Sequence, residues 1–125
     1  MKSHFILYVS DQGASARFYE KVLGRKPRLD VPGMTEFQLN GESILGLMPA
    51  AGIRKLLGSK LPDPDGAKGI PRAEVYLLVE NPGDLHRLAL ANGASELSPL
   101  SIRDWGHEAA YSLDPDGHVL VFARE

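Results

Sequence analysis

The sequence predicts an α+β fold built from two copies of one strand–helix–hairpin unit. A short apolar strand, an amphipathic helix and a hairpin follow one another twice along the chain. The two helix segments are framed alike, because the same number of residues separates Asp11 from Gly24 and Glu80 from Gly93. Between the copies lies a connection that is rich in turn-forming residues.

Length and composition limit what the chain can be. Its 125 residues suit one domain, and 43% hydrophobic with 24% charged residues allow a buried core. The net charge of −2 is spread along the chain without a basic stripe, so we expect no nucleic-acid and no membrane partner. Cysteine is absent, which excludes disulfides and thiolate chemistry and fits a cytoplasmic location. The first apolar run ends at Ser10, so we expect neither a signal peptide nor a membrane span.

The first copy begins with a strand over residues 5–9, which is apolar on both faces and is therefore expected inside a sheet. Asp11 is a suitable N-cap for a helix over residues 14–23, and Gly24 a suitable C-cap. Asn40-Gly41 then predicts a type I′ turn between two antiparallel strands. These strands are expected over residues 35–39 and 42–48, with a further strand near 26–30.

The second copy repeats this order. A strand is expected over residues 73–80, and Asn81-Pro82 has the character of a helix start, with Asn as N-cap and Pro in the first turn. The helix should end near Gly93. A strand near residues 95–98 and a hairpin around the turn at 114–117 complete the copy.

The connection between the copies covers residues 50–71. A short helix is expected over residues 53–57, followed by the turn-rich stretch LPDPDGAKGIP. A long connection of this kind is either a functional lid or a plain crossover, and the sequence leaves both open. The chain is thus expected to be a single domain over residues 1–125, with modules over 1–49 and 72–125.

Two stretches resemble the signatures of a known family. The segment HFILYVSD with ARFYEKVLG is similar to the first-module signature of the vicinal oxygen chelate superfamily, and DPDGHVLVF is similar to the signature that closes its second module. That superfamily includes glyoxalase I, extradiol dioxygenases, and bleomycin- and fosfomycin-resistance proteins. The resemblance implies two βαβββ modules that form an incomplete barrel around a cavity, and a homodimer.

The resemblance also implies where a metal would sit. In members that use one, the ligands occupy four cavity-facing strand positions, which correspond here to His4, Gly46, Glu74 and Val121. Glycine and valine offer no donor atom, whereas a catalytic zinc site normally has three protein ligands. We therefore expect no tightly held metal and no cofactor. His4 and Glu74 remain candidate catalytic residues, as a general base or a ligand anchor. Alternatively they form a hydrogen-bonded pair, or lie unlinked at the cavity rim.

Alternation along the strands predicts which side chains face the cavity. With His4 facing inward, Tyr8, Met48, Tyr76 and Val121 do so too, and they are expected to contact a ligand. Gly46 would leave open space in the wall. The opposite set should pack under the helices; it comprises Phe5, Leu7, Val9, Val75, Leu77, Leu120 and Phe122. In the alternative interpretation, the side chains that share the face of His4 simply fill the barrel and leave no cavity.

The segment SIRDWGHE is a second candidate for ligand contact. Trp105, the only tryptophan, could stack on a planar ligand, and Arg103 could pair with an anion. Alternatively, Trp105 anchors the loop or a dimer contact. His107 could approach the cavity mouth, whereas His86 is expected at the edge of the apolar stripe of its helix or in solvent.

These observations favour a glyoxalase/bleomycin-resistance-like protein that binds an apolar or aromatic small molecule without a tightly held metal. One alternative is a metal-dependent lyase or dioxygenase of the glyoxalase/dioxygenase type with an atypical site. Another is a structural or regulatory module with a filled barrel. Whether the chain is an enzyme is left open by the sequence.

Overall fold

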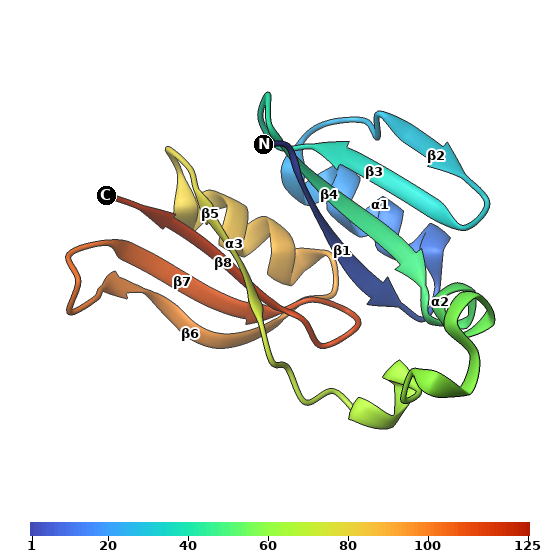
Figure 1. The fold of residues 1–125 in the computed structure, drawn as a ribbon. Helices are drawn as coiled ribbons and strands as arrows, with labels where there is room; N and C mark the ends of the chain where they lie inside the picture. Colours follow the sequence, from blue (N-terminus) through green and yellow to red (C-terminus); the bar gives the residue numbers. More distant parts are fainter. The chain divides into compact units, whose positions relative to one another are not determined.

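The computed structural model describes residues 1–125 and confirms the α+β fold of two βαβββ modules. Figure 1 shows the elements in chain order. The first module contains β1 (Ser3–Val9), α1 (Gln12–Leu23), β2 (Leu29–Val31), β3 (Met34–Gln38) and β4 (Ser43–Pro49). The second contains β5 (Glu74–Leu78), α3 (Pro82–Ala91), β6 (Ser95–Ile102), β7 (Glu108–Leu113) and β8 (Val119–Arg124). No helix is long and apolar enough to cross a membrane.

Each module forms its own four-stranded mixed sheet. The strand orders are β1-β4-β3-β2 and β5-β8-β7-β6, so the two sheets have the same topology. In each, the first strand pairs in parallel with the last, and the other pairs are antiparallel. The internal repeat expected from the sequence is therefore a repeat of whole sheets. The contacts divide the chain into two compact units, one formed by residues 1–20 and 24–68 and the other by 21–23 and 69–125.

The expected linker belongs largely with the first unit. Its helix α2 (Ala50–Leu57) begins directly after β4, three residues earlier than expected, and buries Ile53. Two short 3-10 turns follow, η1 (Gly58–Lys60) and η2 (Pro64–Ala67). In η2 the Asp63 side chain accepts a hydrogen bond from the Asp65 amide, as the turn-rich sequence suggests.

Strand β1 lies at the edge of the first sheet, which corrects the expectation that it is an interior strand. Its Phe5 side chain is 63% exposed, so the prediction that Phe5 packs under a helix was also wrong. Val9, at the other end of the strand, is buried as expected. Apolar residues on both faces of a strand favour burial of both faces, but they do not tell whether the strand has one neighbour or two.

Helix α1 has the caps that the sequence predicts. The Asp11 carboxylate accepts a hydrogen bond from the Ala14 amide, and Gly24 takes the left-handed conformation with φ 65°. The helix runs along one face of the first sheet (Figure 1). The buried apolar side chains of this module that carry most volume are Tyr19, Phe37, Leu45, Leu47, Val9 and Val22.

The β3–β4 hairpin is confirmed, but its turn is not of type I′. Neither Asn40 nor Gly41 has a positive φ. Instead the Asn40 side-chain oxygen accepts hydrogen bonds from the amides of Glu42 and Ser43, at 2.9 Å each. Asparagine can build a turn through its side chain as well as through its backbone, and the dipeptide Asn-Gly does not distinguish the two.

In the second module, α3 packs on one face of its sheet, against β6, β7 and β8. Asn81 occupies the N-cap position, but its side chain makes no capping hydrogen bond. The turn between β7 and β8 matches the prediction, with Gly117 at φ 88°. The Asp114 carboxylate accepts hydrogen bonds from the amides of Asp116 and His118 and so closes this turn.

Candidate functional site

The strand registers show which positions of the two modules are equivalent. In the first sheet, Ile6 is opposite Gly46, and Gly46 is opposite Glu36. In the second sheet, Tyr76 is opposite Val121, and Val121 is opposite Tyr111. Because side chains alternate along a strand, each set shares one face of its sheet. We call these two faces the first and the second open face.

A buried carboxylate anchors the first open face. Glu36 is only 7% exposed, and its Oε2 lies 3.2 Å from His4 Nδ1 and 3.5 Å from Arg28 Nη2. A buried carboxylate costs free energy unless it is paired, and here two partners share that role. His4 therefore has a carboxylate partner within its own unit. Its expected pairing with Glu74, which belongs to the other unit, stays a prediction.

Tyr8 and Met48, two predicted ligand contacts, lie opposite each other on β1 and β4. Tyr8 is 38% exposed, while the end of the Met48 side chain lies against Gly52 of α2. The expectation of open space at Gly46 was wrong. A Cβ added there would come within 3.1 Å of Ile6 Cγ1 and 3.3 Å of Met34 Sδ, so neighbouring side chains already fill the space.

The second open face has a buried apolar base. Val121 is fully buried in a cluster with Ala109 and Ala123, and the partly buried Tyr76 and Tyr111 pack against it. The two tyrosines stand on the strands that flank β8, one on each side of Val121. Val121 thus supports the two aromatic side chains from below.

An aromatic group is held together at one side of this face. The Tyr76 hydroxyl lies 2.9 Å from His107 Nδ1, and Trp105 Nε1–H donates a hydrogen bond to the same hydroxyl at 3.2 Å. The Tyr76 and His107 rings are tilted by 42°, with centroids 6.0 Å apart. Trp105 is nevertheless 55% exposed. We call Tyr76, Trp105, His107 and Tyr111 the aromatic patch.

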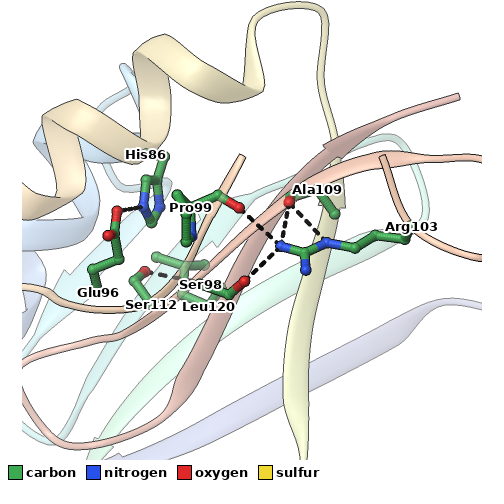
Figure 2. Close-up of polar contacts among 8 residues, drawn as sticks. All are labelled: His86, Glu96, Ser98, Pro99, Arg103, Ala109, Ser112 and Leu120. Atoms are coloured by element: carbon green, nitrogen blue, oxygen red, sulfur yellow. Dashed lines mark hydrogen bonds and ion pairs between the residues drawn. The ribbon is translucent and has the colours of Figure 1, made fainter. Parts of the chain in front are cut away.

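Arg103 lies over the other end of the patch. Its guanidinium carbon is 5.0 Å from the centre of the Tyr111 ring, within range of a cation–π interaction. Its Nε and Nη2 donate hydrogen bonds to the Ala109 carbonyl at 3.1 and 2.7 Å. Nη2 also donates to the Pro99 carbonyl and to Ser98 Oγ, so the side chain is fixed to β6 and β7 (Figure 2).

The electrostatics of the patch act on Tyr111. Burial raises the pKa of the Tyr111 hydroxyl above its ordinary value. The carboxylate of Glu74 and the neighbouring Tyr76 raise it further, while the Arg103 guanidinium opposes them. Glu74 therefore shares the second open face with Tyr76 and Tyr111, and Tyr111 stays neutral at physiological pH.

The residues at the four implied metal positions do not form a ligand set. Gly46 has no side chain and closely packed neighbours, and Val121 is buried among alanines and tyrosines. Only His4 and Glu74 of the four carry a donor atom, and the Nδ1 of His4 already lies against the Glu36 carboxylate. Within either unit, no group of three or more His, Cys, Asp or Glu side chains could hold a metal ion. Donor number and chemistry at these positions thus fall short of what a resident metal requires.

His86 is buried, at 4% exposure, which corrects the expectation of an edge or solvent position. Its Nε2 lies 2.9 Å from Glu96 Oε2, and its buried Nδ1 has no hydrogen-bond partner (Figure 2). The pair joins α3 to β6 on the helix-covered face of the second sheet. His86 therefore contributes to packing rather than to the aromatic patch.

In the second unit, contacts connect the predicted residues Glu74, Tyr76, Arg103, Trp105 and Val121 around the second open face. In the first unit, Tyr8 lies opposite Met48, whereas His4, further along β1, contacts Glu36. Sequence reasoning missed Glu36 and Tyr111. Both lie on strands that neighbour a predicted position, so a register derived from the hairpin turns would have found them. It also missed a groove of about 400 Å³ between α1 and residues 27–32, lined by polar side chains that include Gln12, Arg17 and Asp30.

The sequence model of the Glyoxalase/Bleomycin resistance protein/Dioxygenase superfamily matches residues 3–122, which spans both modules. The chain belongs to this superfamily. The vicinal oxygen chelate resemblance seen in the sequence is thereby confirmed. A comparison with curated proteins found no match.

Several solved structures have the same fold as this chain. A glyoxalase-related enzyme from Fulvimarina pelagi has a TM-score of 0.84 and 23% identity, over 100% of this chain and 88% of that chain. A glyoxalase/bleomycin resistance protein/dioxygenase family enzyme from Burkholderia phytofirmans PsJN has a TM-score of 0.83 and 18% identity, over 98% and 96%. A glyoxalase/bleomycin resistance protein from Albidiferax ferrireducens T118 has a TM-score of 0.74 and 22% identity, over 98% and 97%. At these identities the likeness shows the fold alone.

Proposed function

We propose that this superfamily member binds an aromatic small molecule on the aromatic patch, without a tightly held metal. The observation that supports this most is the fixed arrangement of Tyr76, Trp105 and His107. Aromatic side chains exposed on a loop usually lose mobility when they bind a ligand, and this costs free energy. Here the hydrogen bonds through the Tyr76 hydroxyl hold the rings in place before any ligand arrives. Trp105 still offers more than half of its surface for stacking.

The test is a thermal-shift screen with two panels of small molecules, one aromatic and one aliphatic. A ligand that binds only the folded protein raises its apparent Tm. We expect aromatic compounds to raise the Tm of the wild type and to lose this effect in Trp105→Ala. The matched control is Leu97→Ala, because Leu97 is similarly exposed at 53% but lies outside the patch. If no aromatic compound shifts the Tm, or if both variants respond like the wild type, the proposal is wrong.

The alternative function is a metal-dependent lyase or dioxygenase with an atypical site, such as the superfamily name allows. It is separated from binding by the metal content of the purified protein. One equivalent of tightly retained iron, zinc, nickel or manganese would favour the enzyme. If His4 and Glu74 are the only donors, we expect the purified protein to contain less than about a tenth of an equivalent of metal. Incubation with added metal, followed by removal of the excess, should leave this content unchanged.

A homodimer and a cytoplasmic location are part of the same proposal. The homodimer derives from the family resemblance, and the cytoplasmic location fits the cysteine-free composition. The expectation of no nucleic-acid and no membrane partner derives from the net charge of −2, which is spread along the chain without a basic stripe. Sedimentation analysis of the purified chain tests the dimer directly. A monomer at all concentrations would remove the dimer without affecting the binding proposal, since the patch lies within one unit.

A further inference from the structure

Arg103 is the only arginine of the chain that is not exposed to solvent. A guanidinium with restricted access to water normally has a carboxylate partner, because desolvating an unpaired charge costs free energy. Yet Arg103 takes part in no ion pair, whereas Arg28, Arg54, Arg87 and Arg124 each have one. The positive charge at the edge of the patch is therefore not compensated by the chain itself.

The hydrogen bonds of Arg103 go to neutral acceptors. Nε and Nη2 bind the Ala109 and Pro99 carbonyls and Ser98 Oγ, which fixes the plane of the guanidinium. The third nitrogen, Nη1, makes no hydrogen bond, and Figure 2 shows it pointing away from the residues that hold the other two. A guanidinium whose orientation is already fixed loses little entropy when its free N–H groups bind an anion.

The acidic side chains nearby do not take this place. Glu108 pairs with Arg124, Asp104 is exposed at the turn, and Glu74 lies no closer to Arg103 than the ion-pair limit. The Tyr111 ring beneath the guanidinium makes a cation–π contact but carries no negative charge that would neutralise it. The Arg103 guanidinium is thus an oriented cation without an anionic partner on the second open face, and it is available to bind an external anion.

The turn over residues 103–107 connects this cation to the aromatic group. The Arg103 amide donates to the His107 carbonyl at 2.8 Å, and the Gly106 amide donates to the Arg103 carbonyl at 2.9 Å. The same tight turn carries Trp105 to the Tyr76 hydroxyl. Because one turn positions both the cation and the exposed ring, a ligand that carries a negative charge and an aromatic ring can use both.

We propose that Arg103 binds the carboxylate of an aromatic acid whose ring stacks on Trp105. The proposal rests on the function proposed above and narrows it to one chemical class, the aromatic carboxylates. Charge-assisted hydrogen bonds that Nη1 donates to the carboxylate select for the anion, and the aromatic patch supplies the affinity for the ring.

The test compares 2-naphthoate with 2-naphthamide, which has the same shape without the charge. The reporter is the indole N–H resonance of Trp105, which is the only tryptophan and therefore gives a single signal in a ¹⁵N correlation spectrum. We expect both compounds to shift this signal. The carboxylate should bind about tenfold more tightly, since a hydrogen bond to a charged group contributes about 1.5 kcal/mol. Raising the salt concentration should weaken the binding of 2-naphthoate and leave the binding of 2-naphthamide unchanged.

Two variants locate the effect. Arg103→Gln should bring the naphthoate affinity down to that of the naphthamide, while Arg103→Lys should keep part of the difference because the charge remains. Arg124→Gln is the matched control, since Arg124 is a paired arginine of the same unit, and it should behave like the wild type. If Arg103→Gln does not fold, Arg103→Lys and the salt dependence of naphthoate binding to the wild type still test the role of the Arg103 charge.

The outcomes separate the two proposals. If neither compound shifts the Trp105 signal in a saturable way, the aromatic binding function itself is wrong. If both bind equally well, or if Arg103→Gln keeps the preference for the carboxylate, the binding function stands and the role of Arg103 is wrong. If Arg124→Gln loses the preference as Arg103→Gln does, the charge acts at long range and the assignment to Arg103 is also overturned.

Discussion

The two modules share one sheet topology, but each buries the opposite member of a histidine–carboxylate pair. In the first, Glu36 is buried and the His4 side chain is 44% exposed. In the second, His86 is buried and the Glu96 side chain is 44% exposed. Glu36 has a second partner in Arg28, whereas His86 has only Glu96.

This difference shows how far the backbone determines the chemistry of a module. Equivalent strands bring equivalent positions together, yet the residue at each position decides which surface can bind. The first open face keeps its charges paired within the chain, through Glu36, His4 and Arg28. The second keeps the Arg103 cation unpaired, over the ring of Tyr111, and the turn that begins at Arg103 also carries Trp105. The fold thus supplies two similar platforms, and the side chains make only the second a candidate site for an aromatic ligand.

The largest expected effect comes from exchanging the equivalent residues Gly46 and Val121. Val121→Gly removes a fully buried side chain and loosens a central strand, which should lower the free energy of unfolding by about 3 kcal/mol. Gly46→Val forces a side chain against Ile6 and Met34 and should cost about 2 kcal/mol. Urea unfolding followed by circular dichroism measures both. A stable Gly46→Val protein would contradict the close packing at Gly46.

The next pair compares the arginines that hold backbone carbonyls in each module. Arg103→Ala removes hydrogen bonds to Ala109, Pro99 and Ser98 and should cost about 2 kcal/mol of stability. Arg25→Ala removes hydrogen bonds from an exposed guanidinium to the Gln38 and Leu39 carbonyls and should cost about 1 kcal/mol. The same urea titrations apply. Equal losses of stability in the two variants would mean that the half-buried position of Arg103 does not strengthen its hydrogen bonds.

The histidine–carboxylate pairs give a smaller difference. Glu96→Ala leaves both ring nitrogens of buried His86 without a partner and should cost about 1.5 kcal/mol. His4→Ala leaves Glu36 paired with Arg28 and should cost less than about 0.5 kcal/mol. Thermal unfolding at neutral pH orders the two variants. If His4→Ala proves the more damaging, Arg28 does not compensate Glu36.

The smallest effect concerns alkaline pH and Tyr111. Because the pKa of the folded Tyr111 hydroxyl lies above that of the unfolded chain, its neutral form stabilises the fold below about pH 10. This contribution is lost as the pH rises through the raised pKa. Tyr111→Phe should therefore lose less stability than the wild type between about pH 8 and about pH 11. Urea midpoints at the two pH values measure it, and identical losses in both proteins would contradict the raised pKa.

Local signals in the sequence predicted much of the fold. The caps of α1 at Asp11 and Gly24, the turn at Asp114–Gly117 and the repeat of the two modules depend on short stretches of chain, and all were confirmed. The sheet position of β1 was not predictable in this way, because strand order is set by contacts far apart in the sequence. The turn at Asn40 failed for a different reason, since two turn geometries share one dipeptide.

The candidate site was predicted in outline only. Tyr76, Arg103 and Trp105 stood out by residue type, and the structure places them around one turn. The partners Glu36 and Tyr111 depend on cross-strand register, and the burial of His86 depends on how α3 rotates on its sheet. Periodicity over a helix of 10 residues is too short to fix that rotation.

The outer strand of the second sheet has a consequence for how the chain behaves at high concentration. Strand β6 is 8 residues long, lies at the sheet edge and exposes Leu97 and Ile102, which would make it a template for strand addition by another molecule. Its register shifts twice between Glu96 and Ser101, and Pro99 offers no N–H. The Pro99 carbonyl is moreover occupied by Arg103. The irregular register and Pro99 therefore make β6 a poor template for strand addition, and the Arg103 side chain helps to fix this part of the edge.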